Sequence, residues 1–194
     1  MLTLTVLQPW ASLLVCGVKT VENRTWASAG LRPGAWLAIH AGRLDAHAIS
    51  PAFVEDILAR WPGGPSSFSS LPRCTIVGAV RFEGYGHGGR RKGYPGECLC
   101  RFLPDGDAIC DLRPSCNPWA SGPVCWCMDR AVALESPKPS WSQRGRLGLW
   151  PCPADVKAGL DRLIAERHND FQLRLPHTIS GRITRPSTTV GANP

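Results

Sequence analysis

Apolar and polar residues alternate at the start of the chain, where Leu2, Leu4 and Val6 are separated by threonines. A period of two residues is typical of a strand with one buried face. Pro9 then opens a predicted helix, because proline fits the first turn of a helix, and Gly17 ends it. The chain is therefore expected to begin with a strand and a short helix.

Later apolar stretches predict more strands and two more helices. Residues 20–26 are rich in β-branched side chains and predict a second strand, with Glu22 and Arg24 on one of its faces and Lys19 in the turn before it. Helices are expected to start near Ser50 and Asp155. Further strands are expected over residues 34–41, 74–82, 124–134 and 147–150. The pattern favours an α+β fold: a small mixed-sheet β-barrel with two or three peripheral helices.

The predicted barrel covers residues 1–153 and contains one long irregular stretch. Residues 84–118 hold many glycines and prolines and are longer than an ordinary connection, so we expect an insertion over one end of the barrel. A C-terminal helix is expected over residues 154–173. Residues 174–194 have no apolar period, which predicts a disordered tail.

Composition points to an anionic partner and a reducing compartment. The formal net charge is +7 with a pI near 9.1, which favours a polyanion such as RNA. Nine cysteines occur without a leader-like start, so we expect reduced thiols and a cytoplasmic protein. The longest apolar stretch is far shorter than the roughly 20 residues of a membrane span, so no membrane association is expected.

The run from residue 17 to residue 24 contains the most distinctive chemistry. Lys19, Glu22 and Arg24 lie within six residues of one another. Such a cluster can be a solvated strand edge with ion pairs. Trp10 and Trp26 stand close by in sequence, and aromatic faces beside fixed cations suit the stacking of a base and the binding of a phosphate.

Together with Gly17, these three charged residues fit the pattern Gly-x-Lys-x-x-Glu-x-Arg. With the flanking segments 8–12 and 117–123, this part of the chain resembles the ASCH domain (activating signal cointegrator homology), a family of the PUA-like superfamily. The resemblance implies a PUA-like barrel whose basic cleft binds RNA or a modified nucleobase. Protein partners are left open.

Under this hypothesis Lys19 and Arg24 hold the nucleic-acid backbone, the tryptophans stack on bases, and Glu22 positions the two cations. The expected ligand-binding residues are Gln8, Trp10, Lys19, Glu22, Arg24, Trp26, His40 and Trp126.

Enzymatic alternatives follow from the same resemblance. Some ASCH proteins are similar to amidohydrolases that remove acyl groups from N4 of cytidine with the signature lysine, which corresponds to Lys19. Here Glu22 occupies the position of their threonine, and Glu83 is a candidate for the distant carboxylate. Other members are described as ribonucleases, for which His40 is the histidine in a matching segment.

Clustered cysteines raise the question of a zinc site. Cys98, Cys100, Cys110 and Cys116 are close in sequence, and Cys125 and Cys127 follow them. The pairs Cys98/Cys100 and Cys125/Cys127 are Cys-x-Cys rather than the Cys-x-x-Cys of a zinc knuckle. We therefore expect no metal and no other cofactor.

Overall fold

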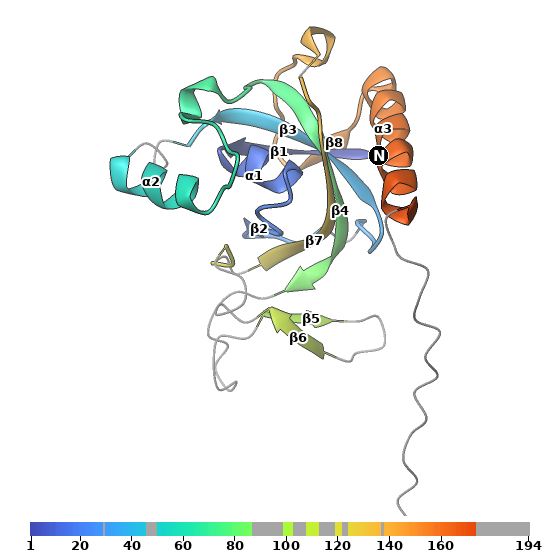
Figure 1. The fold of residues 1–194 in the computed structure, drawn as a ribbon. Coiled ribbons are helices and arrows are strands. Elements are labelled where there is room, and N and C mark those ends of the chain that lie inside the picture. Colours follow the sequence, from blue (N-terminus) through green and yellow to red (C-terminus); the bar gives the residue numbers. More distant parts are fainter. Residues whose placement is uncertain are drawn as a thin grey trace, which may run out of the picture.

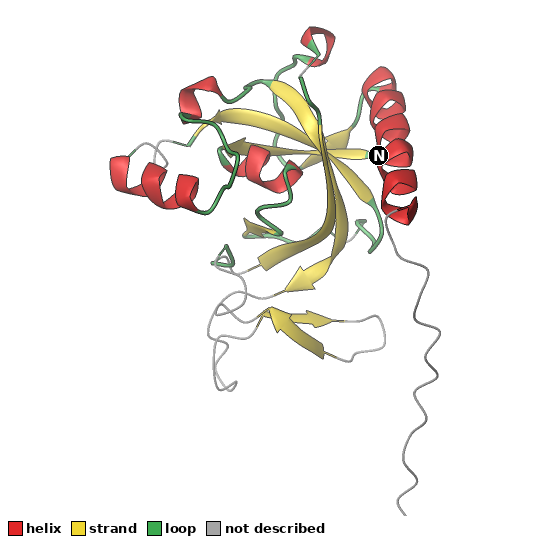
Figure 2. Ribbon diagram, in the orientation of Figure 1, coloured by secondary structure: helices red, strands yellow, loops and turns green. Residues whose placement is uncertain are grey.

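The computed structural model describes residues 1–28, 30–45, 50–86, 99–102, 108–112, 119–121, 124–136 and 138–173. They form one six-stranded sheet, a separate two-stranded ladder and three α-helices, which confirms the predicted α+β class (Figures 1 and 2). The strands are β1 (Leu2–Gln8), β2 (Val21–Arg24), β3 (Trp36–Leu44), β4 (Thr75–Gly86), β5 (Leu99–Phe102), β6 (Ala108–Leu112), β7 (Val124–Ala133) and β8 (Leu149–Pro151). The helices are α1 (Trp10–Val15), α2 (Pro51–Ala59) and α3 (Ala154–Leu173), with short 3₁₀ turns at Phe68–Ser70 and Pro139–Trp141.

The main sheet has the strand order β2-β7-β4-β3-β1-β8 and is mixed, because β1 runs parallel to β3 while the other neighbours are antiparallel. Its edges are β2 and β8, and within the described residues no ladder joins them. The predicted barrel is thus an open one. Strand β8 pairs only with Leu2, Thr3 and Leu4, so the rest of β1 continues beyond it.

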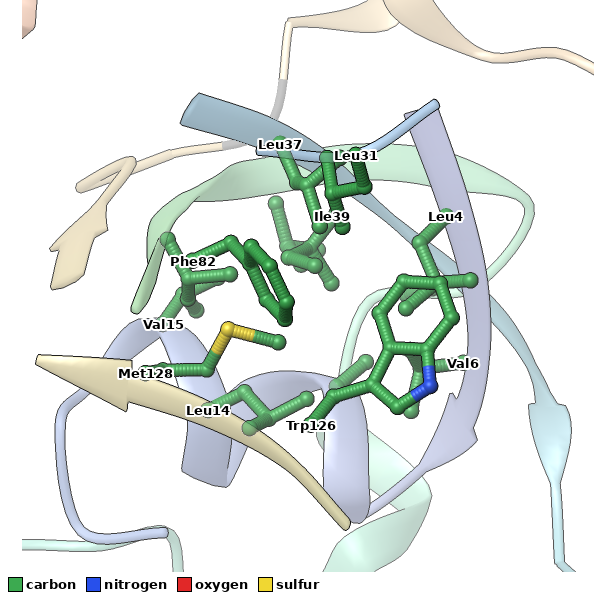
Figure 3. Packing of buried hydrophobic residues seen from close by; sticks show 14 residues of the cluster. Leu4, Val6, Leu14, Val15, Leu31, Leu37, Ile39, Phe82, Trp126 and Met128 are labelled. Atoms are coloured by element: carbon green, nitrogen blue, oxygen red, sulfur yellow. The ribbon is translucent and has the colours of Figure 1, made fainter. Parts of the chain in front are cut away.

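Both faces of the sheet are covered by helices (Figure 2). On one face, α1 packs its Leu14 and Val15 into a core with Leu4, Phe82 and Trp126 (Figure 3). The opposite face carries Ala38, Ile76 and Trp150, which pack against Val156 and Leu160 of α3. Burial of apolar surface on both faces fixes which side chains of β1 and β2 are left to line a site at the edge.

Helix α2 lies against α1 rather than on the sheet. Leu13 of α1 packs with Ile57, Trp61 and Phe68 in a separate buried cluster. The predicted start of α2 is confirmed, because the Ser50 hydroxyl accepts a hydrogen bond from the backbone N–H of Phe53 at 3.4 Å.

Strand β4 is longer than the sequence pattern predicts. It continues to Gly86, paired with β7, so residues 84–86 belong to the sheet and not to an insertion. The reason is Tyr85, whose ring centroid lies 4.8 Å from that of Phe82 and whose hydroxyl donates to the Ser28 carbonyl. Strands β5 and β6 also place an ordered ladder in the stretch expected to be irregular.

The structure does not describe the predicted tail or much of the predicted insertion. Residues 87–98, with the basic run Arg90-Arg91-Lys92, and the tail 174–194 lie outside the described residues. Within the described part of the chain, no helix is long and apolar enough to cross a membrane.

Gly78 sits where β4 is packed most tightly. A Cβ at this position would lie 2.2 Å from the Val132 carbonyl oxygen and 3.0 Å from Val15, and the backbone φ is +156°. The register between β3 and β4 shifts at the same place, between Ile39 and His40. Gly78 therefore stands both where the register shifts and where the backbone of β7 comes close.

We therefore expect Gly78→Ala to lower the free energy of unfolding by about 3 kcal/mol, because the methyl group overpacks the junction of β4, β7 and α1. Urea unfolding followed by tryptophan fluorescence measures the change. Gly30→Ala is the matched control, since nothing lies within 4 Å of its added Cβ, and should change stability by less than about 0.5 kcal/mol. Equal effects of the two substitutions would contradict this packing.

Candidate functional site

A cavity of about 670 Å³ opens where β1 continues beyond β8 and faces β2 across the unpaired edge of the sheet. Its volume is typical of a small-molecule site. The wall is assembled from β1, α1, β2 and α2 and from the segments that carry Lys19, Asp45, Trp119 and Arg146. Its charged lining residues are Lys19, Glu22, Arg24, Asp45, Asp56, Arg60 and Arg146, and its aromatic ones are Trp10, Phe53 and Trp119.

Lys19 is buried at the floor of this cavity, with 4% of its side chain exposed. The turn after α1 brings it there, since its backbone N–H donates to the Leu13 carbonyl at 3.0 Å. Its ammonium donates to the Val21 carbonyl and to Oε2 of Glu22, the latter at 2.8 Å. The side chain of Lys19 is therefore held in place by two protein acceptors.

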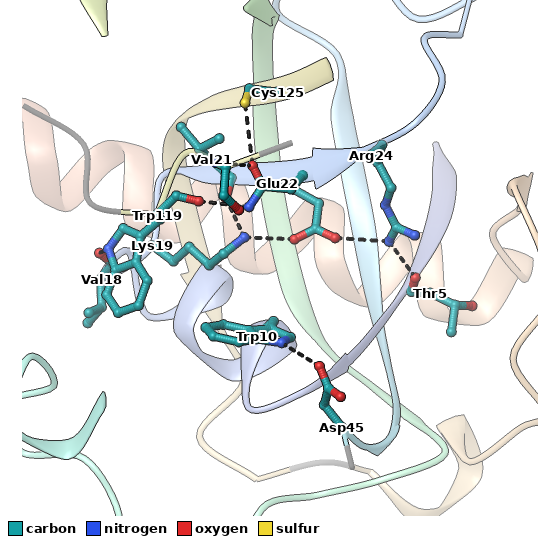
Figure 4. Close-up of polar contacts among 12 residues, drawn as sticks. Thr5, Trp10, Val18, Lys19, Val21, Glu22, Arg24, Asp45, Trp119 and Cys125 are labelled. Carbon is teal, nitrogen blue, oxygen red and sulfur yellow. Dashed lines mark hydrogen bonds and ion pairs between the residues drawn. The ribbon is translucent and has the colours of Figure 1, made fainter. Parts of the chain in front are cut away.

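Glu22 links Lys19 to Arg24. Its other carboxylate oxygen lies 3.1 Å from Nη2 of Arg24, and that nitrogen also donates to the Thr5 carbonyl at 2.8 Å (Figure 4). Glu22 and Arg24 share one face of β2, as the two-residue period of the strand requires. A chain of charge thus runs from Lys19 through Glu22 and Arg24 to the backbone of β1; we call these three side chains the ion-pair chain.

Arg24 has one further donor for which the described residues offer no partner. Both hydrogen bonds given above use Nη2, and its buried Nε finds no acceptor among the described residues. A buried donor without a partner costs free energy in the folded protein.

Two tryptophans form the aromatic wall. The ring of Trp10 lies with its centroid 6.2 Å from that of Trp119, at an interplanar angle of 71°. Each indole N–H is fixed, that of Trp10 by Oδ2 of Asp45 at 3.1 Å and that of Trp119 by the Val18 carbonyl at 3.0 Å. The Lys19 ammonium is 5.8 Å from the Trp10 centroid, within cation–π range.

Asn23, on the other face of β2, holds Trp119 in place. Its amide nitrogen donates to the Trp119 carbonyl at 2.7 Å, and its amide oxygen accepts from the backbone N–H of Ser121 at 3.0 Å. Glu22 and Arg24 of β2 therefore contribute to the charged floor, and Asn23 between them holds Trp119 in the wall.

Five of the predicted site residues are not among the described residues that line the cavity. Gln8 is fully buried, and its amide bridges the Pro72 carbonyl and the Ser12 N–H. Trp126 lies opposite Glu22 in the β2–β7 ladder, yet its ring packs in the core, edge-on against Trp26, whose carbonyl accepts its indole N–H at 3.0 Å.

His40 and Glu83 also lie elsewhere. His40 is buried behind the turn before β8, where Nε2 donates to the Gln143 carbonyl at 2.9 Å, and burial lowers the pKa of its imidazole despite that hydrogen bond. Glu83 lies on β4. The hydrogen bond from Arg81 to Asp129 is the main cause that raises the pKa of the Arg81 guanidinium, and the charge of Glu83 adds to it against the opposing effect of burial. Of the predicted site residues, the structure brings together Trp10, Lys19, Glu22 and Arg24.

Several lining residues were missed by the sequence analysis, Trp119 above all. A signal for it exists: Pro-Trp-Ala-Ser occurs at residues 9–12 and again at residues 118–121, and the tryptophan of each copy lines the same cavity. Asp45, Phe53 and Arg60 carry no comparable signal, because only the packing of α2 and the end of β3 brings them to the site.

The comparison with protein families agrees with this geometry. Residues 4–86, which include Lys19, Glu22 and Arg24, match the family model of the ASCH domain. The chain carries an ASCH domain. The matched segment runs from within β1 to the end of β4, so Trp119, β7 and β8 come from beyond it. No curated protein matches the sequence.

The zinc hypothesis receives no test from this structure. The side chains of Cys98, Cys100, Cys110 and Cys116 lie outside the described residues. Among those that are described, no group of three or more His, Cys, Asp and Glu side chains could hold a metal ion.

We expect Glu22→Gln to lower the free energy of unfolding by about 3 kcal/mol, because it leaves the buried Lys19 ammonium without its carboxylate. Urea unfolding at pH 7 measures the change. The matched control is Asp56→Asn, which breaks the exposed Asp56–Arg60 pair and should cost less than about 1 kcal/mol. If the two variants lose the same stability, the ion-pair chain does not hold this part of the fold together.

Proposed function

We propose that this ASCH protein binds RNA by taking one nucleobase, with its attached phosphate, into the cavity. The observation that carries the proposal is the position of the ion-pair chain directly beside the Trp10–Trp119 wall within a single cavity. The ASCH family also suggests an association with RNA.

The charges of the floor favour an anionic or strongly polar ligand. In the ion-pair chain two cations share one carboxylate, which leaves an excess of positive charge among these three side chains. A lysine ammonium has three N–H groups, and the two hydrogen bonds described for Lys19 use two of them. The third, together with the donors of Arg24, suits a phosphate or a base carbonyl.

The aromatic wall favours a planar group. Bases bind by stacking on aromatic side chains, and the fixed indoles of Trp10 and Trp119 lose little conformational freedom when a base arrives. In this proposal Trp10 and Trp119 contact the base, Lys19 and Arg24 contact its phosphate or carbonyl oxygens, and Glu22 holds the two cations in register.

Binding is expected to fall when either cation is changed. Lys19→Met removes a charge, whereas Arg24→Lys keeps the charge but loses the planar fork, and each should weaken binding of single-stranded RNA by about 10- to 100-fold at low salt. Lys19→Met should also reduce the slope of log Kd against log salt by about one. Fluorescence anisotropy with a labelled RNA pool measures both quantities.

Lys157→Met is the matched control, because it also removes one ion-paired lysine, from α3. It should leave RNA affinity within about twofold of wild type. Circular dichroism verifies that each variant is folded. Unchanged affinity and salt slope in folded Lys19→Met would overturn the proposal.

Hydrolysis of N4-acylated cytidine is the second candidate function. The observation that favours it is the carboxylate of Glu22 at 2.8 Å from the Lys19 ammonium inside the cavity. Against it, a nucleophilic lysine needs a free amine, whereas two acceptors hold the protons of Lys19, and Glu83 is not among the described lining residues.

Absorbance-monitored incubation of N4-acetylcytidine with the purified protein separates the two functions. We expect no turnover at high protein concentration, because the Lys19 ammonium is already engaged by the Val21 carbonyl and the Glu22 carboxylate. Turnover that disappears in Lys19→Met would instead make the protein an amidohydrolase. Turnover that persists in this variant would point to a contaminating enzyme.

A further inference from the structure

Two large apolar side chains are exposed to solvent at the rim of the cavity. Among the described residues, the large hydrophobic side chains classed as exposed are Leu7, at 42%, and Leu147, at 99%. Both lie on the rim of the same cavity. Single exposed leucines are common on protein surfaces, but two that line the same proposed binding site call for a physical explanation.

The turn that displays Leu147 is fixed on both sides. A Cβ at Gly145 would lie 2.8 Å from the His40 ring and 2.9 Å from the Thr5 side chain, so the backbone is packed directly on β1 and β3. The next residue, Arg146, donates its backbone N–H to the Thr5 hydroxyl at 3.2 Å, and β8 begins at Leu149. The fold therefore holds a fully exposed leucine outward between two anchored points.

Arginine side chains line the cavity together with these leucines. The guanidinium of Arg146 lies 5.6 Å from the centroid of the Trp150 ring, and this residue lines the cavity next to Leu147. Across the opening, Arg24 spans from β2 to the carbonyl of Thr5. Apolar side chains interleaved with arginines suit a ligand that presents flat apolar faces and phosphates in alternation.

We propose that Leu7, Arg146 and Leu147 form a second subsite, for the nucleotide adjoining the one in the cavity. The ligand is then a single-stranded polynucleotide and not a free nucleoside. Leu147 packs against the neighbouring base, as apolar wedges do in other nucleic-acid complexes, and Arg146 neutralises the phosphate between the two nucleotides. This inference rests on the proposed function.

The small apolar area of the rim and the arginine beside it favour a polynucleotide over a protein partner. Two leucines flanked by arginine make a small apolar area, whereas protein docking sites are large continuous patches. The rim is also continuous with the cavity, so one extended ligand can occupy both.

Comparing long and short ligands tests the second subsite. We would measure the affinity of wild type, Leu147→Ser and Leu147→Met for single-stranded RNA of about ten nucleotides and for a mixture of the four nucleoside monophosphates. Leu147→Ser should weaken RNA binding about five- to tenfold and weaken mononucleotide binding much less. Leu147→Met keeps an apolar side chain and should retain most of the RNA affinity. Arg146→Gln should reduce the salt slope for RNA by about one.

The outcomes distinguish this inference from the function on which it rests. RNA binding by wild type that Leu147→Ser does not weaken, or equal affinities for RNA and mononucleotides, would overturn the second subsite and leave the cavity as a nucleotide site. Wild-type protein that binds neither ligand would overturn the proposed function, and the subsite with it.

Discussion

The chain of contacts from Lys19 through Glu22 and Arg24 to the Thr5 carbonyl is the interaction on which the site depends. Strands β2 and β8 are the edges of an open sheet, and in the described residues no backbone ladder connects β2 to β1. Arg24 makes that connection with its side chain. The cavity lies where the sheet is open. Across this opening the side chain of Arg24, and not another described strand, joins β2 to β1.

Such an arrangement has an energetic cost that packing alone would avoid. Burying Lys19 and Glu22 removes both from water, and apolar residues of similar size often give equal or greater stability than a buried ion pair. The two cations around one carboxylate also leave positive charge uncompensated. A ligand with phosphate or carbonyl oxygens supplies the missing acceptors, so the same residues that make the empty site costly favour the bound one.

The sequence predicts the position of a side chain when that position depends only on contacts within its own strand or helix. The two-residue period places Glu22 and Arg24 on one face of β2, and Ser50 marks the start of α2; both are local properties. Trp126 illustrates the limit. Residue type and family resemblance favour a tryptophan at the site, but only the packed fold distinguishes a core ring from a wall ring, and Trp126 is a core ring.

Trp119, the wall residue that the sequence analysis missed, shows the same limit. It reaches the cavity because Asn23 hydrogen-bonds its backbone from about a hundred residues away in the chain, a contact that no local pattern encodes. Strand β4 differs from expectation for a related reason: Gly84 and Gly86 resemble loop residues, yet Tyr85 between them packs on Phe82 and extends the strand. Long-range packing decides both cases.

The central claim is that a base enters between the ion-pair chain and the wall formed by Trp10 and Trp119. Two-dimensional NMR of the indole N–H groups during titration with single-stranded RNA tests it most directly. We predict that the signals of Trp10 and Trp119 shift with added RNA, while those of the buried Trp126 and Trp141 stay in place. Shifts confined to other tryptophans, with Trp10 and Trp119 unmoved, would contradict it.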